Sequence, residues 1–198
     1  TLDSNRSNSN RAIAELYRQH VTELQGRCEA LLDRQGYEGM LIHAGSISNY
    51  FLDDNHRPFK SNPHLLAWVP LTQHPSSCLL IRPGCKPRLF YFNPTDFWYK
   101  PAGVPEGFWT EHFEITEIAK PDEVLSALDT GKNLAFIGED QALAGRWGIR
   151  DINPEPLLAA LHWQRAVKSD YELHCLRRAN EHAVCGHLAA AKAFRAGA

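Results

Sequence analysis

The sequence lacks the features that would assign it to a specialised class of protein. It has no excess of positive charge, since 21 lysines and arginines face 23 aspartates and glutamates and leave a formal net charge of -2. A nucleic-acid surface needs such an excess, so we expect no nucleic acid as a primary partner. No stretch approaches the roughly 18 apolar residues of a membrane span, so we expect no membrane partner.

The sequence lacks paired cysteines, and two common catalytic motifs are missing. The five cysteines form no C-x-x-C pair, which argues against a structural zinc site or a thioredoxin-like site. Free thiols in a reducing cytoplasm are the simplest interpretation of their odd number and wide spacing. Neither the G-x-S-x-G elbow of serine hydrolases nor the G-x-x-x-x-G-K-[ST] loop of nucleotide-binding enzymes is present. We therefore expect a cytoplasmic protein with neither chemistry.

What is present fits one globular domain, or one domain with part of a second. Of the 198 residues, 43% are hydrophobic, which is enough for a core. The start of the chain is polar and has no apolar segment, so we expect residues 1–11 to form a disordered or artificially added tail. From Ile13 to Leu32 apolar residues recur every three or four positions, which predicts an amphipathic helix.

Short apolar runs then alternate with helical segments. Pro83 and Gly84 suit a hairpin loop between two antiparallel strands. The alternation predicts an α/β domain over residues 12–166, in which a mixed β-sheet is flanked by helices. The expected strands cover residues 40–43, 65–69, 77–81, 88–92, 112–118 and 133–137, and short helices cover residues 121–128 and 140–146.

Two helix starts follow each other near the C-terminal end. Asn153 is expected to be the N-cap of a helix that has Pro154 at its first position and runs to about Ala166. Ser169 and Glu172 form a capping box that starts a long helix with an apolar stripe. Because such a stripe needs a partner, we expect residues 167–198 to be a linker and the first helix of a truncated second domain.

Ten histidines raise the question of a metal site, but their spacing argues against one. His174 lies one helical turn before Arg178, whose positive charge would repel a cation from that face. Cys175 adjoins His174, yet neighbouring helix residues point about 100° apart, which disfavours a Cys–His nucleophilic pair. The spacing therefore favours a solvated or interdomain face over a metal site, and a structural cysteine over a nucleophile.

Two loops carry residues that could contact a ligand. Asp53 and Asp54 follow an aromatic and aliphatic run and precede His56 and Arg57, which makes a polar cluster. Ordinary turn chemistry is the alternative, because Asp and Asn favour turns by bonding their own backbone. Trp98 belongs to an aromatic triplet after a strand, and its alternative is packing on the core.

Three strings closely resemble the amino-terminal part of bacterial Xaa-Pro dipeptidases of the creatinase/prolidase family. They are F-L-D-D-N-H-R-P-F-K-S-N-P at residues 51–63, A-W-V-P at residues 67–70 and D-F-W at residues 96–98. The related organophosphorus acid anhydrolases share these stretches, and the resemblance runs from about Ala12 to Ala196. It implies a creatinase/prolidase amino-terminal domain followed by the start of a pita-bread catalytic domain. The family's two divalent metals, with manganese expected, would be held by residues that have no counterpart in this chain.

The resemblance also implies roles for two residues. Asp54 matches the family carboxylate near the amino end of an Xaa-Pro dipeptide, and Trp98 matches an aromatic that closes the pocket across a homodimer. A carboxylate that faces an ammonium group gives a charge-assisted hydrogen bond worth roughly 1.5–3 kcal/mol. This chain would therefore be the dimerising and substrate-selecting domain of a dipeptidase, and inactive by itself.

Two alternatives stay open at this point. A stand-alone creatinase-type domain could serve oligomerisation or partner binding without catalysis, and a chain that truly stops near Ala198 would favour it. A related proline-specific aminopeptidase would need space beyond the amino-end site for longer peptides. Asp54 would occupy that space, which argues against the aminopeptidase.

Overall fold

The computed structural model describes residues 2–95, 97, 103–128 and 133–197. The chain divides into two compact units, one formed by Val21–Arg165 and the other by Thr1–His20 with Ala166–Ala198. The division at Arg165 lies beside the boundary expected at about Val167. The division at His20 lies within the first helix, where the sequence shows no change of pattern.

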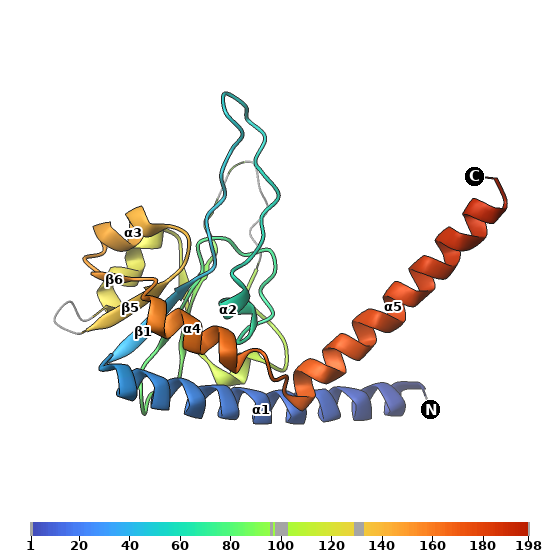
Figure 1. The fold of residues 1–198 in the computed structure, drawn as a ribbon, viewed down its shortest axis with the longest axis horizontal. Helices are drawn as coiled ribbons and strands as arrows, with labels where there is room; N and C mark the ends of the chain where they lie inside the picture. Colours follow the sequence, from blue (N-terminus) through green and yellow to red (C-terminus); the bar gives the residue numbers. More distant parts are fainter. Residues whose placement is uncertain (1, 96, 98–102, 129–132, 198) are drawn as a thin grey trace. The chain divides into compact units, whose positions relative to one another are not determined.

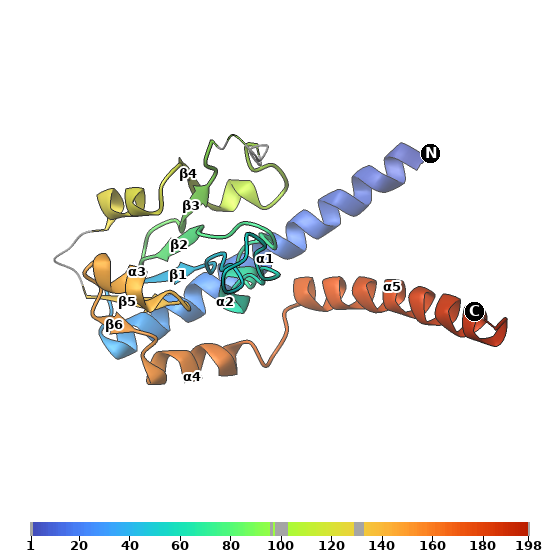
Figure 2. The same cartoon turned by 90° about the horizontal axis from the view of Figure 1, so that it is seen from above.

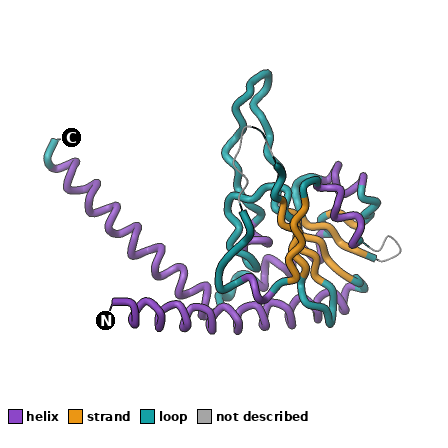
Figure 3. The backbone as a smooth tube through the Cα atoms, turned by 180° about the vertical axis from the view of Figure 1, so that it is seen from behind, coloured by secondary structure: helices purple, strands orange, loops and turns teal. Residues whose placement is uncertain are grey.

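The larger unit is built on one mixed sheet of six strands (Figures 1 and 3), which confirms the predicted fold class. The strand order is β4-β3-β2-β1-β5-β6. Strand β2 pairs antiparallel with both β1 and β3, whereas the β3–β4, β1–β5 and β5–β6 pairs are parallel. The strands are β1 (Gly39–His43), β2 (Cys78–Ile81), β3 (Arg88–Phe92), β4 (Glu114–Ile118), β5 (Leu134–Ile137) and β6 (Asp151–Ile152).

Helices cover both faces of this sheet (Figure 2). One face packs against the 3-10 helix η2 (Pro121–Ala127) and α3 (Gln141–Arg146), with Leu41, Leu80 and Phe136 in one shared core. Side chains alternate between faces along a strand, so Ile42 lies on the opposite face from Leu41. That opposite face is covered by residues 21–35 of α1 (Leu2–Gln35), by α2 (Pro63–Leu66) and by α4 (Glu155–Gln164). Burial on both faces explains why β1, β2 and β5 are continuous apolar runs.

The strand predicted at residues 65–69 is wrong, because Pro63–Leu66 form the helix α2. The side-chain oxygen of Asn62 accepts a hydrogen bond from the backbone nitrogen of His64 at 2.9 Å. Pro63 lies in the first turn, where its missing N–H is not needed. Local capping therefore outweighs the β-propensity of the leucine and tryptophan side chains that follow.

The helix cap predicted at Asn153 is also wrong. Asn153 adopts a positive φ of 49°, and its side chain bonds the backbone nitrogen and oxygen of Gly138 at 3.0 and 2.8 Å. Pro154 is the N-cap instead, and α4 ends at Gln164 rather than near Ala166. Asn153 thus ties the end of β6 to the end of β5. Strand β6 was not predicted, since two residues are too short to show a pattern.

Other element limits differ slightly from the prediction. Strand β4 starts at Glu114 because Thr110–His112 form a 3-10 helix, η1. Helix α1 begins at Leu2, whereas the sequence predicted a tail over residues 1–11 and a helix from Ile13. No glycine or proline occurs between residues 2 and 25 to stop the helix from extending. The hairpin around Pro83 and Gly84 is confirmed by the antiparallel β2–β3 pair.

The smaller unit contains the first part of α1 and the helix α5 (Asp170–Arg195). The predicted capping box is confirmed, since Ser169 and Glu172 bond each other's backbone. Tyr17 and Tyr171 pack edge to face at 5.0 Å, and Nδ1 of His20 lies 2.7 Å from Oγ of Ser169. These contacts hold α5 by its first turn. None of the described helices combines the length and hydropathy needed to cross a membrane.

Candidate functional site

The candidate site lies where β1 and β5 end at the same edge of the sheet. These neighbouring strands are parallel, and β1 is antiparallel to β2 on its other side. In open α/β sheets, ligands bind outside the carboxyl ends of the strands, where connections diverge. A long loop, residues 44–62, leaves β1 at this edge and projects from the sheet before it returns (Figure 1).

Asn62 ties the returning end of this loop to both strands. Its side-chain nitrogen lies 3.0 Å from the carbonyl oxygen of His43 and 3.3 Å from that of Ile137. Its backbone nitrogen donates to the carbonyl oxygen of Ala44 at 2.8 Å. The same residue caps α2, so its backbone and side chain together link the loop to two strands and a helix.

His43 ends β1 inside the core and is fully buried. The backbone nitrogen of Gly45 donates to Nδ1 at 3.2 Å, which places the ring proton on Nε2 when the ring is neutral. Nε2 has no hydrogen-bond partner among the described residues. Burial lowers the pKa of His43 to about 4, so the ring is neutral at physiological pH.

A polar pocket lies beside the base of the loop. Ser46, Arg57, Lys60 and Glu139 contribute to its lining. Oγ of Ser46 donates to Oδ2 of the neighbouring Asp140 at 3.0 Å. Desolvation raises the pKa of the Asp140 carboxyl, but hydrogen bonds from the Leu143 backbone and from Ser46 outweigh it and hold this pKa below its ordinary value. Asp140 is therefore charged and serves as the cap of α3.

The two legs of the loop are joined near its tip. Asn49 and His56 form an antiparallel bridge. The backbone nitrogen of Tyr50 donates to the oxygen of Asn55 at 3.0 Å, and that of Arg57 donates to the oxygen of Ser48 at 2.9 Å. The Arg57 guanidinium also lies over the Tyr50 ring, 5.6 Å from its centroid. The tip is therefore a supported turn, although it projects into solvent.

The tip carries two adjacent carboxylates and two exposed apolar side chains. Phe51 and Leu52 are 90% and 91% exposed. Oδ1 of Asp53 accepts from both the backbone and the side-chain nitrogen of Asn55, each at 2.8 Å. Asp54 is exposed and makes no side-chain hydrogen bond or ion pair with the part of the chain that the structure describes. One carboxylate is thus engaged in the turn, and the other faces solvent.

The structure places one of the two predicted ligand residues. Asp54 lies at the tip of the loop, whereas Trp98 lies outside the described residues, so its role stays a prediction. Sequence reasoning missed Asn62 and His43. The Asn-Pro pair at residues 62–63 is a helix-start signal that could have indicated the cap, but nothing local indicates bonds to two strands.

The described residues of this chain form no metal centre. Across residues 2–95, 97, 103–128 and 133–197, no group of three or more His, Cys, Asp or Glu side chains is placed to hold an ion. The face that α5 presents is apolar instead, with Leu176, Val184, Leu188 and Phe194 between 46% and 82% exposed.

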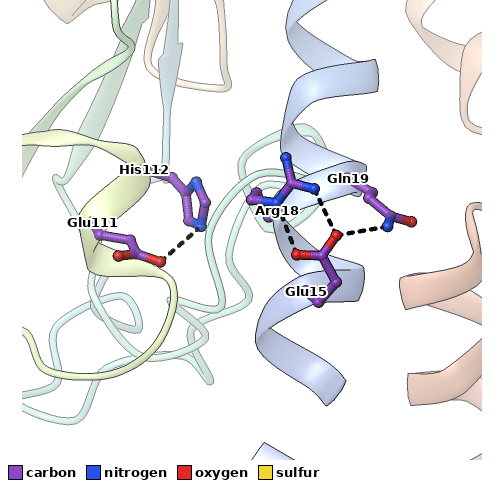
Figure 4. Close-up of polar contacts among 5 residues, drawn as sticks. All are labelled: Glu15, Arg18, Gln19, Glu111 and His112. Atoms are coloured by element: carbon purple, nitrogen blue, oxygen red, sulfur yellow. Dashed lines mark hydrogen bonds and ion pairs between the residues drawn. The ribbon is translucent and has the colours of Figure 1, made fainter. Parts of the chain in front are cut away.

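Two other groups of polar contacts join residues that are close in the sequence (Figure 4). Glu15 accepts two bonds from Arg18, at 2.6 and 2.9 Å, and one from Gln19 at 2.8 Å. The Arg18 bonds, then the Gln19 bond, lower the pKa of Glu15 to about 2. Glu111 lies 3.6 Å from Nε2 of His112. The Glu15–Arg18 pair is exposed and contributes little to stability, whereas the His112 side chain is only 14% exposed.

Comparison with known proteins matches this chain to one family model and to relatives that share one description. A family model described as the Xaa-Pro dipeptidase N-terminal domain matches residues 15–163. An Xaa-Pro dipeptidase of Pseudoalteromonas atlantica is 44% identical over 186 residues, which are 93% of this chain and 42% of that protein. Xaa-Pro dipeptidases of Shewanella sp. strain MR-4 and Shewanella baltica strain OS185 are each 43% identical over 94% of this chain. The chain spans less than half the length of these curated relatives.

Proposed function

Because this chain belongs to the family of Xaa-Pro dipeptidase N-terminal domains, we propose that it is the dimerising and substrate-selecting part of a longer dipeptidase. The substrates are dipeptides with a carboxy-terminal proline. The observation that carries the proposal is Asp54, a solvent-facing carboxylate on a supported loop that projects from the edge of the sheet.

Asp54 suits recognition of a free amino group. The ammonium of a dipeptide carries a positive charge next to its first residue, and a fixed carboxylate accepts a charge-assisted hydrogen bond from it. A longer peptide extended at its amino end would place backbone where Asp54 lies. The same carboxylate therefore favours dipeptides and disfavours peptides without a free amino end at that position.

A second copy of the chain completes the site in this proposal. Phe51 and Leu52 flank the carboxylates and are almost fully exposed, which is costly in water unless another surface covers them. We place them against the partner subunit, with Asp54 directed at the partner's substrate. Trp98 is the proposed aromatic that shields the proline ring from water.

The catalytic step belongs to the rest of the longer protein. Two divalent metals, with manganese expected, would be held by residues of that part and would supply Lewis-acid activation of a water and of the carbonyl before proline. The described residues of this chain do not fit those metals, so their contribution is to bind and orient the substrate. The proposal includes a cytoplasmic location and an inactive isolated chain.

The test is Asp54→Asn in the longer enzyme. Loss of one charge-assisted hydrogen bond of roughly 1.5–3 kcal/mol should lower kcat/KM for an Xaa-Pro dipeptide about 10- to 100-fold. Asp33→Asn is the matched control, because Asp33 is an exposed carboxylate on α1, away from the loop. An amino-acetylated dipeptide lacks the ammonium, so the variant should not lose activity on it relative to wild type.

Two results would contradict the proposal. An Asp54→Asn enzyme with unchanged kcat/KM would remove Asp54 from the substrate site. A wild-type enzyme that cleaves tripeptides with proline in second position faster than dipeptides would be a proline-specific aminopeptidase.

A further inference from the structure

The two carboxylates at the loop tip have different surroundings. Oδ1 of Asp53 accepts from the backbone nitrogen and from Nδ2 of Asn55, both at 2.8 Å. The backbone nitrogen of Asp53 itself donates to the Tyr50 oxygen at 3.2 Å. The residue between the two partners of this clasp is Asp54. The clasp, formed by Asp53 and Asn55, therefore closes over the backbone that carries Asp54.

The backbone just before the clasp is constrained as well. Leu52 has a φ of 56°, a left-handed conformation that a branched side chain rarely adopts. Such a conformation persists only where the surrounding structure determines it. Here the surrounding structure is the Asn49–His56 bridge and the bond from Tyr50 N to Asn55 O. The leucine side chain itself is almost fully exposed and makes no core contact that could hold it.

We propose that Asp53 is a positioning residue, which holds the Asp54 carboxylate in place for the substrate ammonium. This inference rests on the proposed function, in which Asp54 contacts the substrate. In this proposal Asp53 acts through the turn rather than on the ligand, because its Oδ1 accepts both donors of Asn55. It acts by keeping the turn ordered before the substrate arrives, so that binding does not have to order the loop.

The position of the clasp predicts which kinetic parameter changes. Without the clasp, part of the free energy of substrate binding would be needed to order the loop. The contact with the ammonium is the same in the ground state and in the transition state. Loss of the clasp should therefore raise KM and leave kcat nearly unchanged. A general loss of folding would instead reduce the amount of active enzyme and lower kcat.

Asp53→Ala and Asp53→Asn in the longer enzyme separate the roles of charge and geometry. Asp53→Ala removes the oxygen that accepts the two hydrogen bonds from Asn55. We expect KM for an Xaa-Pro dipeptide to rise about 3- to 10-fold, which corresponds to the loss of these bonds. We expect kcat to stay within about twofold of wild type. Asp53→Asn keeps a side-chain oxygen that accepts the same two bonds, because Asn forms this turn as Asp does. KM of Asp53→Asn should stay within about twofold of wild type.

Hydrogen exchange gives a readout that does not depend on activity. Peptides from residues 47–60 should exchange faster in Asp53→Ala than in wild type or Asp53→Asn, while peptides from the sheet stay unchanged. Asn55→Ala retains the backbone donor and loses the side-chain donor, so its exchange and its KM should be intermediate.

The results distinguish this inference from the function on which it rests. Asp54→Asn with unchanged KM and kcat would overturn the proposed function. An impaired Asp54→Asn beside an Asp53→Ala enzyme with unchanged KM would overturn only the positioning role. An Asp53→Asn enzyme as impaired as Asp53→Ala would show that the charge of Asp53 acts on the ligand directly, which also overturns the positioning role.

Discussion

Burial controls the chemistry of single residues in this chain, and His43 is an example at the edge of the candidate site. The ring stacks against Phe136 with centroids 5.9 Å apart and meets the edge of Trp147 at 6.4 Å. It lies too deep for water to stabilise a charged form, which lowers its pKa to about 4. Its low pKa is therefore a property of the core rather than a sign of catalysis.

This shift predicts how stability depends on pH. Between pH 6.5 and about 4 the unfolded chain binds a proton at residue 43, whereas the folded chain does not, so the free energy of unfolding falls as the pH falls. The contribution of His43 is fully present above pH 6.5, and about 2 kcal/mol of it should be lost between pH 7 and pH 5. His43→Asn keeps an acceptor for Gly45 and removes the titration. Between pH 7 and pH 5, the free energy of unfolding of His43→Asn should therefore fall by about 2 kcal/mol less than that of wild type. Urea denaturation at the two pH values measures this difference.

A control is needed because His64 titrates in the same range. Burial, then the charges of Arg165 and His162, lower the pKa of His64 to about 4. His43→Asn should therefore remove only part of the pH dependence, and His182→Asn, at an exposed position on α5, is the matched control. Equal pH slopes for wild type and His43→Asn would show that His43 does not contribute.

At the scale of elements, local patterns predicted most helices and strands, and failed where one polar side chain decided the structure. The apolar runs of β1, β2, β3 and β5 and the capping box of α5 are confirmed. Residues 65–69 have strand-forming side chains, yet the cap from Asn62 and the turn at Pro63 start a helix there. Asn153 is a residue type that favours helix caps, but its side chain forms hydrogen bonds with the backbone of Gly138 instead.

Ser169 is the residue on which the start of α5 depends. Its Oγ accepts from the backbone nitrogen of Glu172 at 3.3 Å and lies 2.7 Å from Nδ1 of the buried His20. Ser169→Ala removes both contacts and should lower the free energy of unfolding by about 1–2 kcal/mol. Ser169→Thr, which keeps the hydroxyl, should recover most of it. Ser126→Ala is the matched control, because Ser126 is an exposed serine on η2 whose hydroxyl donates to the Glu123 oxygen three residues earlier. An equal fall in the free energy of unfolding for Ser126→Ala would contradict the role of Ser169.

At the scale of the whole molecule, the chain is one part of a larger assembly in our proposal. It spans 42–43% of the length of the first two curated relatives, and exposed apolar side chains lie on its loop tip and on α5. The apolar stripe of the last helix and the resemblance to a family both predicted a truncated second domain, whereas the exposed apolar side chains of the loop tip were not predicted. The structure adds that the loop tip is ordered by hydrogen bonds, which makes it suitable for contact with a second copy.

Light scattering on the longer enzyme tests the assembly. We expect a dimer, and Phe51→Ser combined with Leu52→Ser should shift it toward monomer, since each large apolar side chain contributes about 1.5–3 kcal/mol when buried. The dissociation constant should rise at least about 10-fold. Leu125→Ser, a partly exposed leucine on η2, is the control. A double variant that stays as firmly dimeric as this control would exclude the loop tip from the interface.

The sequence by itself determined the class of fold, the order of most elements, the capping of α5 and the resemblance that points to dipeptide hydrolysis. These are local properties, because periodicity, caps and short motifs each depend on residues that are close together in the sequence. Only the tertiary structure decided that Asn62 bonds the ends of β1 and β5, that Asn153 bonds Gly138 and that His43 is buried and neutral. These contacts join residues that are distant in the sequence. A buried polar group finds its partner only once packing has brought the strands together.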